Sequence, residues 1–183
     1  MSRLDTIKYN VHTVFQHETP ERLSEIAHSL AIPVHLMLFN LDGNMNIAMS
    51  IRTAAVLGCS DVWIIGKRRY DARPEVGAKN YIRVHKRDFV DRSFFTEQGI
   101  QPVLVEQGGT PLETFKFKSM MHAPVCFIMG SESDGLPLEF LQDMKDAPRI
   151  SISQCGLLRS LNVSVAASIV LYEYFKQWRI SRM

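Results

Sequence analysis

Two short segments of the chain carry polar side chains at spacings that could support chemistry on a bound ligand. In NMNIAMSIRTAAVLG, the amide of Asn46 precedes the guanidinium of Arg52 by six residues. In VCFIMGSESDGLP, an apolar run ends at Gly130, and the carboxylate of Glu132 follows. Glycine lets a ligand or another backbone approach closely, and a glutamate beside it can pair with a cation. If Asn46 caps a helix, its side chain lies at the helix mouth, where it and Arg52 can reach a shared cleft.

A third segment, QCGLLRSLNVSVAASIV, places hydroxyl and amide groups before a long apolar stretch. We expect Ser160 to cap the helix and Asn162 to lie in its first turn. The small residues that follow, including Ser164, permit close packing against another element. Each segment also has an ordinary interpretation: a surface ion pair for Arg52, a helix cap for Asn46, a common turn after Gly130, and a buried terminal helix.

The elements that must position these residues alternate along the chain. Short apolar runs without clean polar alternation suit strands that are buried on both faces of a parallel sheet. The sequence therefore predicts an α/β fold in which helices cover both faces of the sheet. The expected strands are Val34–Phe39, Val62–Ile65, Tyr81–His85, Pro102–Glu106, Val125–Met129 and Arg149–Ser153. The expected helices are Pro20–Leu30, Asn46–Leu57, Asp88–Gln98, Pro137–Met144 and Leu161–Trp178.

Local signals support these elements and locate the site. Thr19 before Pro20 is typical of a helix start, and Gly58 is typical of a helix end. Three segments, EQGGTPL, GSESDGLP and SQCGLLRS, follow strands and are expected to be loops. Ligands of open α/β sheets bind at the carboxyl ends of the strands, so these loops should form the site.

Composition excludes several classes of protein. The 183 residues, with 46% apolar and 22% charged side chains, suit one globular domain. No apolar run reaches the roughly 20 residues that span a bilayer, and the first residues do not resemble a signal peptide. Three cysteines, Cys59, Cys126 and Cys155, lie far apart, which argues against a disulfide framework or a metal site. We expect reduced core thiols and a cytoplasmic protein.

Positive charge is concentrated in residues 67–92, which hold nine Lys or Arg against four acidic residues, whereas the whole chain carries +2. Such a basic segment is typical of contact with a nucleic-acid phosphate backbone. The alternative is a solvated loop with no partner. Two tyrosines of this segment, Tyr70 and Tyr81, could stack on unpaired bases.

Together, the order and spacing of the three motifs resemble the SpoU/TrmH type of the SPOUT superfamily of RNA methyltransferases. The resemblance covers roughly residues 34–177, and SLNVSVA is its most specific part. It implies an α/β domain, residues 32–183, after a short helical extension, residues 1–31. It also implies a carboxy-terminal trefoil knot, a homodimer, S-adenosylmethionine as cofactor and methylation of a ribose 2′-hydroxyl in RNA. Two positions depart from the usual pattern: Ala48 replaces a glycine, and Ile152-Ser153-Gln154 replaces Ile-Pro-Met.

The resemblance also assigns roles to residues. Arg52 would act on the 2′-hydroxyl, either as a base or by stabilising the alkoxide. Asn46 would orient Arg52 or a ribose or phosphate oxygen of the substrate. Ser160 and Asn162 would hold a substrate phosphate, and Glu132 would help to fix the site. The expected cofactor-binding residues are Val105 or Glu106 (with the register open by one residue), Gly130, Ile152 and Leu161. The expected RNA-binding residues are Arg68, Arg69, Arg73 and Lys79.

The variant QxGxxRSLNV, with Gln154, Gly156 and Arg159, resembles the eukaryotic tRNA D-loop guanosine branch of the family more than the common bacterial form. This resemblance implies a tRNA substrate methylated at a D-loop guanosine. The tRNA wobble ribose and ribosomal RNA are alternatives with the same chemistry. A knotted RNA-binding protein without activity is an alternative of another class, which the presence of Arg52 and Ser160 disfavours. The partners expected are RNA and a second copy of the chain, with neither DNA nor a membrane.

Overall fold

A six-stranded parallel sheet forms the centre of the computed structural model, which describes residues 10–39, 44–66 and 69–183. The strand order is β3-β2-β1-β5-β4-β6, and each pair of neighbouring strands is parallel. The predicted α/β class with a mostly parallel sheet is confirmed. The strands are β1 (Ile32–Phe39), β2 (Cys59–Ile65), β3 (Arg83–Arg87), β4 (Gln101–Pro111), β5 (Val125–Met129) and β6 (Arg149–Ser151).

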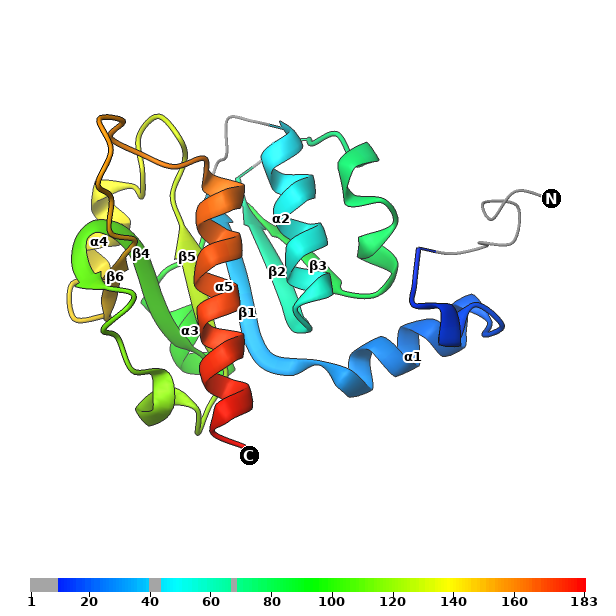
Figure 1. The fold of residues 1–183 in the computed structure, drawn as a ribbon. Helices are drawn as coiled ribbons and strands as arrows, with labels where there is room; N and C mark the ends of the chain where they lie inside the picture. The colour runs from blue at the N-terminus through cyan, green and yellow to red at the C-terminus, as the bar shows by residue number, and fades with distance from the viewer. Residues whose placement is uncertain (1–9, 40–43, 67–68) are drawn as a thin grey trace.

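Helices cover both faces of the sheet (Figure 1). α2 and α5 lie side by side on one face, α3 and α4 lie on the other, and α1 projects away from the sheet. The helices are α1 (Pro20–Leu30), α2 (Asn44–Val56), α3 (Arg92–Gln98), α4 (Leu138–Asp143) and α5 (Val163–Ile180). Short 3-10 turns lie at Thr13–Phe15 (η1), Arg73–Glu75 (η2), Ala78–Asn80 (η3) and Phe117–Met120 (η4). In the part of the chain described, no helix combines the length and apolarity that crossing a membrane requires.

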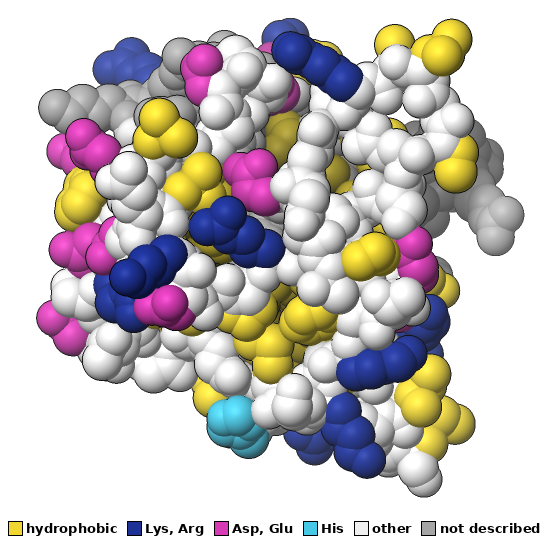
Figure 2. All heavy atoms as spheres, turned by 90° about the vertical axis from the view of Figure 1, so that its left-hand side faces the viewer, with side chains coloured by type: hydrophobic (Ala, Val, Ile, Leu, Met, Phe, Trp, Pro, Cys, Tyr) yellow, Lys and Arg dark blue, Asp and Glu magenta, His cyan; other side chains and the backbone are white. Residues whose placement is uncertain are grey.

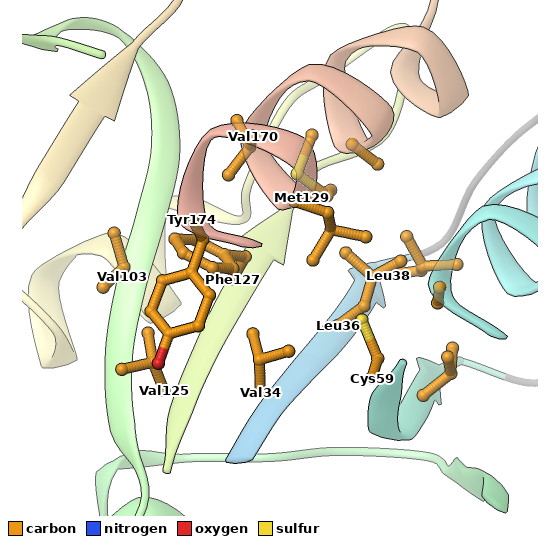
Figure 3. Close-up of a cluster of buried hydrophobic side chains, with 14 of the residues drawn as sticks. Val34, Leu36, Leu38, Cys59, Val103, Val125, Phe127, Met129, Val170 and Tyr174 are labelled. Carbon is orange, nitrogen blue, oxygen red and sulfur yellow. The ribbon is translucent and has the colours of Figure 1, made fainter. Parts of the chain in front are cut away.

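The larger core lies between the sheet and α2 with α5. Strands β1, β4 and β5 send small aliphatic side chains toward an aromatic cluster around Tyr174 (Figure 3). The Tyr174 ring meets the rings of Phe127 and Phe117 edge-on, at centroid distances of 5.5 and 5.3 Å. Edge-to-face aromatic pairs add stabilisation beyond the burial of their area. This packing fixes α5 on the sheet, and with it the residues at the amino end of α5.

Charged groups join β2 and β3 away from the motifs. The carboxylate of Asp61 on β2 is almost fully buried and accepts two hydrogen bonds from Arg83, at 2.8 and 2.9 Å. His85 lies 2.7 Å from the same carboxylate. Burial alone would raise the pKa of Asp61, but the bonds from Arg83 and His85 outweigh it and hold that pKa well below its usual value. The charge is therefore paired within the sheet and holds the edge strand β3 in place.

Two predicted caps have different outcomes. Thr19 caps α1 as predicted, because its Oγ1 accepts from the backbone N–H of Arg22 at 3.2 Å. Ser160 was expected to cap the carboxy-terminal helix, and this is wrong. α5 begins at Val163, and Asn162 is its cap, accepting from the backbone N–H of Ser164 at 2.9 Å. Asn162 satisfies one of the amide groups that a helix start leaves without a partner.

Other boundaries also differ from the prediction. Asn46 is not a cap, because α2 already begins at Asn44, which places Asn46 in the first turn. The segment EQGGTPL is not a plain loop, because β4 continues through it to Pro111 and pairs with β6 on both sides of a register shift. Cys155 is exposed rather than part of the core, whereas Cys59 and Cys126 are buried as expected.

Candidate functional site

A cleft of about 360 Å³ opens at the carboxyl ends of β4, β5 and β6. The loops that follow β5 and β6 form two of its walls, and the far half of β4 forms the third. This is the edge of a parallel sheet where ligands bind in open α/β folds. Nine of the residues singled out in the sequence line the cleft: Val105, Glu106, Gly130, Glu132, Ile152, Gln154, Arg159, Ser160 and Leu161.

The loop after β5 folds tightly onto itself. Ser131 and Gly135 exchange two backbone hydrogen bonds, at 2.9 and 3.1 Å. Gly130 lies so close to this turn that an added Cβ would come within 2.2 Å of the Gly135 carbonyl carbon. The carboxylate of Glu106, on β4, accepts from the backbone N–H of Leu136 at 3.1 Å and ties the loop to the neighbouring strand. Only glycine at position 130 allows this closed turn.

The segment between β6 and α5, residues 152–162, forms the opposite wall. The side chain of Gln107, on β4, donates to the carbonyl oxygen of Arg159 at 2.6 Å and fastens this segment across the cleft. Arg159 and Gln107 both line the cleft. Gln107 could not be predicted as a site residue, because a single glutamine at the end of an apolar run carries no signal of its own. On this side of the molecule, acidic and basic side chains are interspersed (Figure 2).

Polar side chains of three motifs meet beside the cleft. The amide nitrogen of Asn46, on α2, donates to the carboxylate of Glu132. The amide nitrogen of Asn162 donates to the Asn46 oxygen at 3.0 Å. The structure therefore joins the first, second and third motifs through side chains that are 86 and 116 residues apart in sequence.

Arg52 does not line this cleft. It is exposed on α2, on the same side of the helix as Met45, Met49 and Val56, which are 57%, 46% and 78% exposed. Residues spaced by four, seven and eleven positions share one face of a helix. Ala48, which replaces the usual glycine of the first motif, is fully buried and is not among the residues that line the cleft.

The basic segment is partly neutralised by its own acidic residues. Arg69, Arg73 and Lys79 are exposed, and Arg68 lies outside the described residues. Arg73 forms a bidentate pair with Asp71, with its Nη2 at 2.6 Å from the carboxylate. Lys79 lies 3.6 Å from the buried Glu75.

Tyr70, expected to stack on bases, is instead part of the fold. Its hydroxyl donates to Glu75 at 3.2 Å, its ring packs against the core, and Lys86 lies over the ring at 5.3 Å from the centroid. Burial and the adjacent Glu75 raise the pKa of Tyr70 to about 12. Its ring is therefore not offered to a base.

Curated relatives of similar sequence carry names of the same kind of enzyme that the three motifs resemble. The tRNA (guanosine(18)-2′-O)-methyltransferase of Escherichia coli K12 is 29% identical over 138 residues, which cover 72% of this chain and 58% of the relative. The chain thus spans little more than half the length of that relative. A Borreliella burgdorferi protein of the same name is 25% identical over 189 residues, covering 97% of this chain and 83% of the relative.

Solved structures share the fold. The TrmH/SpoU tRNA modifying enzyme of A. aeolicus superposes with a TM-score of 0.74 at 22% identity, covering 88% of this chain and 83% of that one. The AviRb methyltransferase of Streptomyces viridochromogenes, in complex with AdoMet, superposes with a TM-score of 0.66 at 25% identity, covering 80% and 58%. The family model of the SpoU rRNA methylases matches residues 33–172. The chain belongs to the SpoU rRNA methylase family.

Proposed function

We propose that this protein transfers a methyl group from S-adenosylmethionine to a ribose 2′-hydroxyl of tRNA, at a D-loop guanosine. The observation that carries the proposal is the meeting of three family motifs at one cleft, where Glu132, Asn46 and Asn162 are joined by hydrogen bonds. The relatives named for methylation of guanosine 18 support the choice of nucleotide.

The cleft suits the proposed cofactor. Its volume of about 360 Å³ lies in the range of small-molecule sites. Val105, Ile152 and Leu161 offer an apolar surface for the adenine ring, and Gly130 leaves room at the end of β5. The carboxylates of Glu106 and Glu132 also line the cleft and favour a cationic ligand. S-Adenosylmethionine supplies an electrophilic methyl group on a positively charged sulfur.

The remaining chemistry belongs to the side chains. The ribose oxygen must lose its proton as it accepts the methyl group, so negative charge develops on that oxygen. A guanidinium has no lone pair to accept a proton, but it stabilises negative charge well. We therefore assign Arg52 to stabilising the developing alkoxide. Asn162 donates to Asn46, which in turn donates to Glu132, and we assign Ser160, which lines the cleft, to binding a substrate phosphate.

We further propose that the enzyme is a homodimer packed through α2 and α5. Exposed apolar side chains on α2 (Met45, Met49 and Val56) surround Arg52, and α5 exposes Val165, Ile169 and Tyr172. A second hollow, lined in part by Val165, Ile169 and Tyr172, adjoins them. Exposed apolar side chains that cluster on one face are typical of an interface. A second copy on this face would enclose Arg52, which is exposed in a single chain. Sedimentation of the purified protein measures whether the dimer forms.

Two structural features of the family are also proposed for this chain. One is a trefoil knot, supported by the course of the chain from β6, at the sheet edge, back across to α5 beside β5 and α2. Stretching the unfolded chain by its ends would test this proposal, because a knotted chain reaches a shorter fully extended length than an unknotted one. The other is the division at residue 31, supported by α1, which buries only Leu23 and projects from the sheet (Figure 1).

We propose that Arg69, Arg73 and Lys79, which are exposed, contact RNA phosphates together with Arg68. Replacing Arg69, Arg73 and Lys79 together by alanine should weaken binding to every RNA tested. It should also make the slope of log affinity against log salt shallower by about 0.7 to 0.9 for each lost contact, because each neutralised phosphate releases counterions. Filter binding over a series of salt concentrations measures both. An unchanged slope would show that this segment only solvates the surface.

The proposed reaction is tested by mapping 2′-O-methyl groups in total RNA from cells with and without the gene. We expect one tRNA position, a D-loop guanosine, to lose its methyl group in the deletion strain. Restoring the gene should restore it, and restoring an Arg52→Ala copy should not. Loss of a methyl group from ribosomal RNA or from the wobble ribose instead would overturn the choice of substrate.

A further inference from the structure

A buried serine hydroxyl is hydrogen-bonded to the group of polar side chains that meets beside the cleft. Ser164, in the first turn of α5, is 3% exposed. Its Oγ donates to the oxygen of Asn162 at 2.6 Å. Asn162 donates in turn to Asn46, at 3.0 Å, and Asn46 donates to Glu132. All three hydrogen bonds run in the same direction, from the core toward the carboxylate at the cleft.

The direction of this chain follows from the chemistry of the amide group. A side-chain amide has one oxygen that accepts and one nitrogen that donates. The Asn162 oxygen accepts both from the hydroxyl and from the backbone N–H of Ser164, at 2.6 and 2.9 Å. Its nitrogen must therefore face Asn46, whose oxygen accepts. The nitrogen of Asn46 is then left to face Glu132, because turning either amide over would set like groups against each other.

We propose that Ser164 is a positioning residue for methyl transfer, which acts through Asn162 and Asn46 to hold the Glu132 carboxylate at the rim of the cleft. This inference rests on the proposed function. Ser164 is almost fully buried, and a hydrogen bond in the protein interior is stronger than one in water. Glu132 is exposed and lies on a loop, so the chain of amides links it to the rigid part of the fold. A carboxylate held in this way fixes where a cationic group can sit in the cleft.

The same pair of helices offers a matched control. One turn further along α5, the hydroxyl of Ser168 donates to the Ser164 carbonyl at 2.7 Å and is hydrogen-bonded to the hydroxyl of Thr53 on α2 at 3.2 Å. These bonds join the same helices with the same type of group, but they do not lead to the cleft. Ser164→Ala also keeps the helix cap, because the backbone N–H of residue 164 still donates to Asn162.

The first test compares the turnover of variants with tRNA and S-adenosylmethionine. We expect Ser164→Ala to lower kcat about three- to tenfold, the range for one lost hydrogen bond, with the KM for the cofactor unchanged. Ser168→Ala should stay within about twofold of the original protein. Ser164→Thr, which keeps the hydroxyl, should recover most of the loss. In combination with Glu132→Gln, Ser164→Ala should add little, because both substitutions interrupt the same chain.

A second test does not depend on activity. The side-chain amide of Asn46 has its own NMR signals, and Asn46 does not contact Ser164 directly. We expect these signals to move in Ser164→Ala and to stay in place in Ser168→Ala. The proposal is overturned if the Asn46 signals do not move, if the two alanine variants lose equal activity, or if the losses of Ser164→Ala and Glu132→Gln simply multiply. Failure of the proposed reaction would appear separately, as an unsubstituted protein that methylates no RNA.

Discussion

Replacing Arg52 by alanine is expected to slow methyl transfer at least about 100-fold, which is the usual effect of removing one charge contact to a developing oxyanion. Arg52 is exposed on α2 and does not line the cofactor cleft, so cofactor affinity should change by no more than a few-fold. Single-turnover kinetics with tRNA measure the first quantity, and calorimetry with S-adenosylmethionine measures the second.

Two further variants make this result specific. Arg52→Lys keeps the charge but loses the planar fork of the guanidinium, and it should recover only part of the rate. Arg179→Ala removes an arginine from the opposite end of α5, roughly 24 Å along the helix from the cleft, and should leave the rate unchanged. Full activity of Arg52→Ala would remove Arg52 from the mechanism, and a large loss of cofactor affinity would move it into the binding site.

Gly130→Ala is expected to lower cofactor affinity at least about tenfold and to destabilise the protein by about 1–3 kcal/mol. The new Cβ would lie 2.2 Å from the Gly135 carbonyl carbon and 2.5 Å from the Leu136 nitrogen. Both neighbours are backbone atoms, so the turn from Ser131 to Gly135 would have to open. This turn carries Glu132 and forms one wall of the cleft. Calorimetry and thermal unfolding measure the two effects.

Gly156→Ala is the matched control for this substitution. Gly156 lies in the segment that forms the opposite wall of the cleft, and an added Cβ there would meet nothing within 4 Å. Cofactor affinity and unfolding temperature should therefore match those of the original protein. If Gly130→Ala bound the cofactor as well as Gly156→Ala does, the closed turn would have no part in the site.

Periodicity and local composition were enough to predict the fold class. Strands β1, β2 and β5 were located because each is a short apolar run whose side chains are buried in the sheet. The edge strand β3 is mostly polar and exposed, and it begins at Arg83 rather than at Tyr81 as predicted. The end of β4 could not be predicted, because QGGT has poor strand propensity. β4 extends through this segment only because Gly109 has no Cβ. A Cβ at that position would lie 2.7 Å from backbone atoms of β6. Tertiary contact therefore overrides local propensity at this position.

The candidate site was predicted in part. The residues that line the cleft lie at the ends of strands, which the sequence locates well. The bond partners were not predictable, because Asn46 meets residues 86 and 116 positions away. Ser164 was expected only to allow close packing, since its type and place in an apolar helix suggest no more. Its role becomes visible only when Asn162, rather than Ser160, is seen to cap α5.

The central claim is tested most directly by identifying the methylated nucleoside. Purified protein is incubated with unmodified tRNA and S-adenosylmethionine that carries a labelled methyl group, and the RNA is digested to nucleosides and analysed by mass spectrometry. We expect the label in 2′-O-methylguanosine. The Arg52→Ala protein should produce almost none of this labelled nucleoside, and the Arg179→Ala protein should produce as much as the original protein. Label on a base, or no label in RNA although the cofactor binds, would contradict the proposed function.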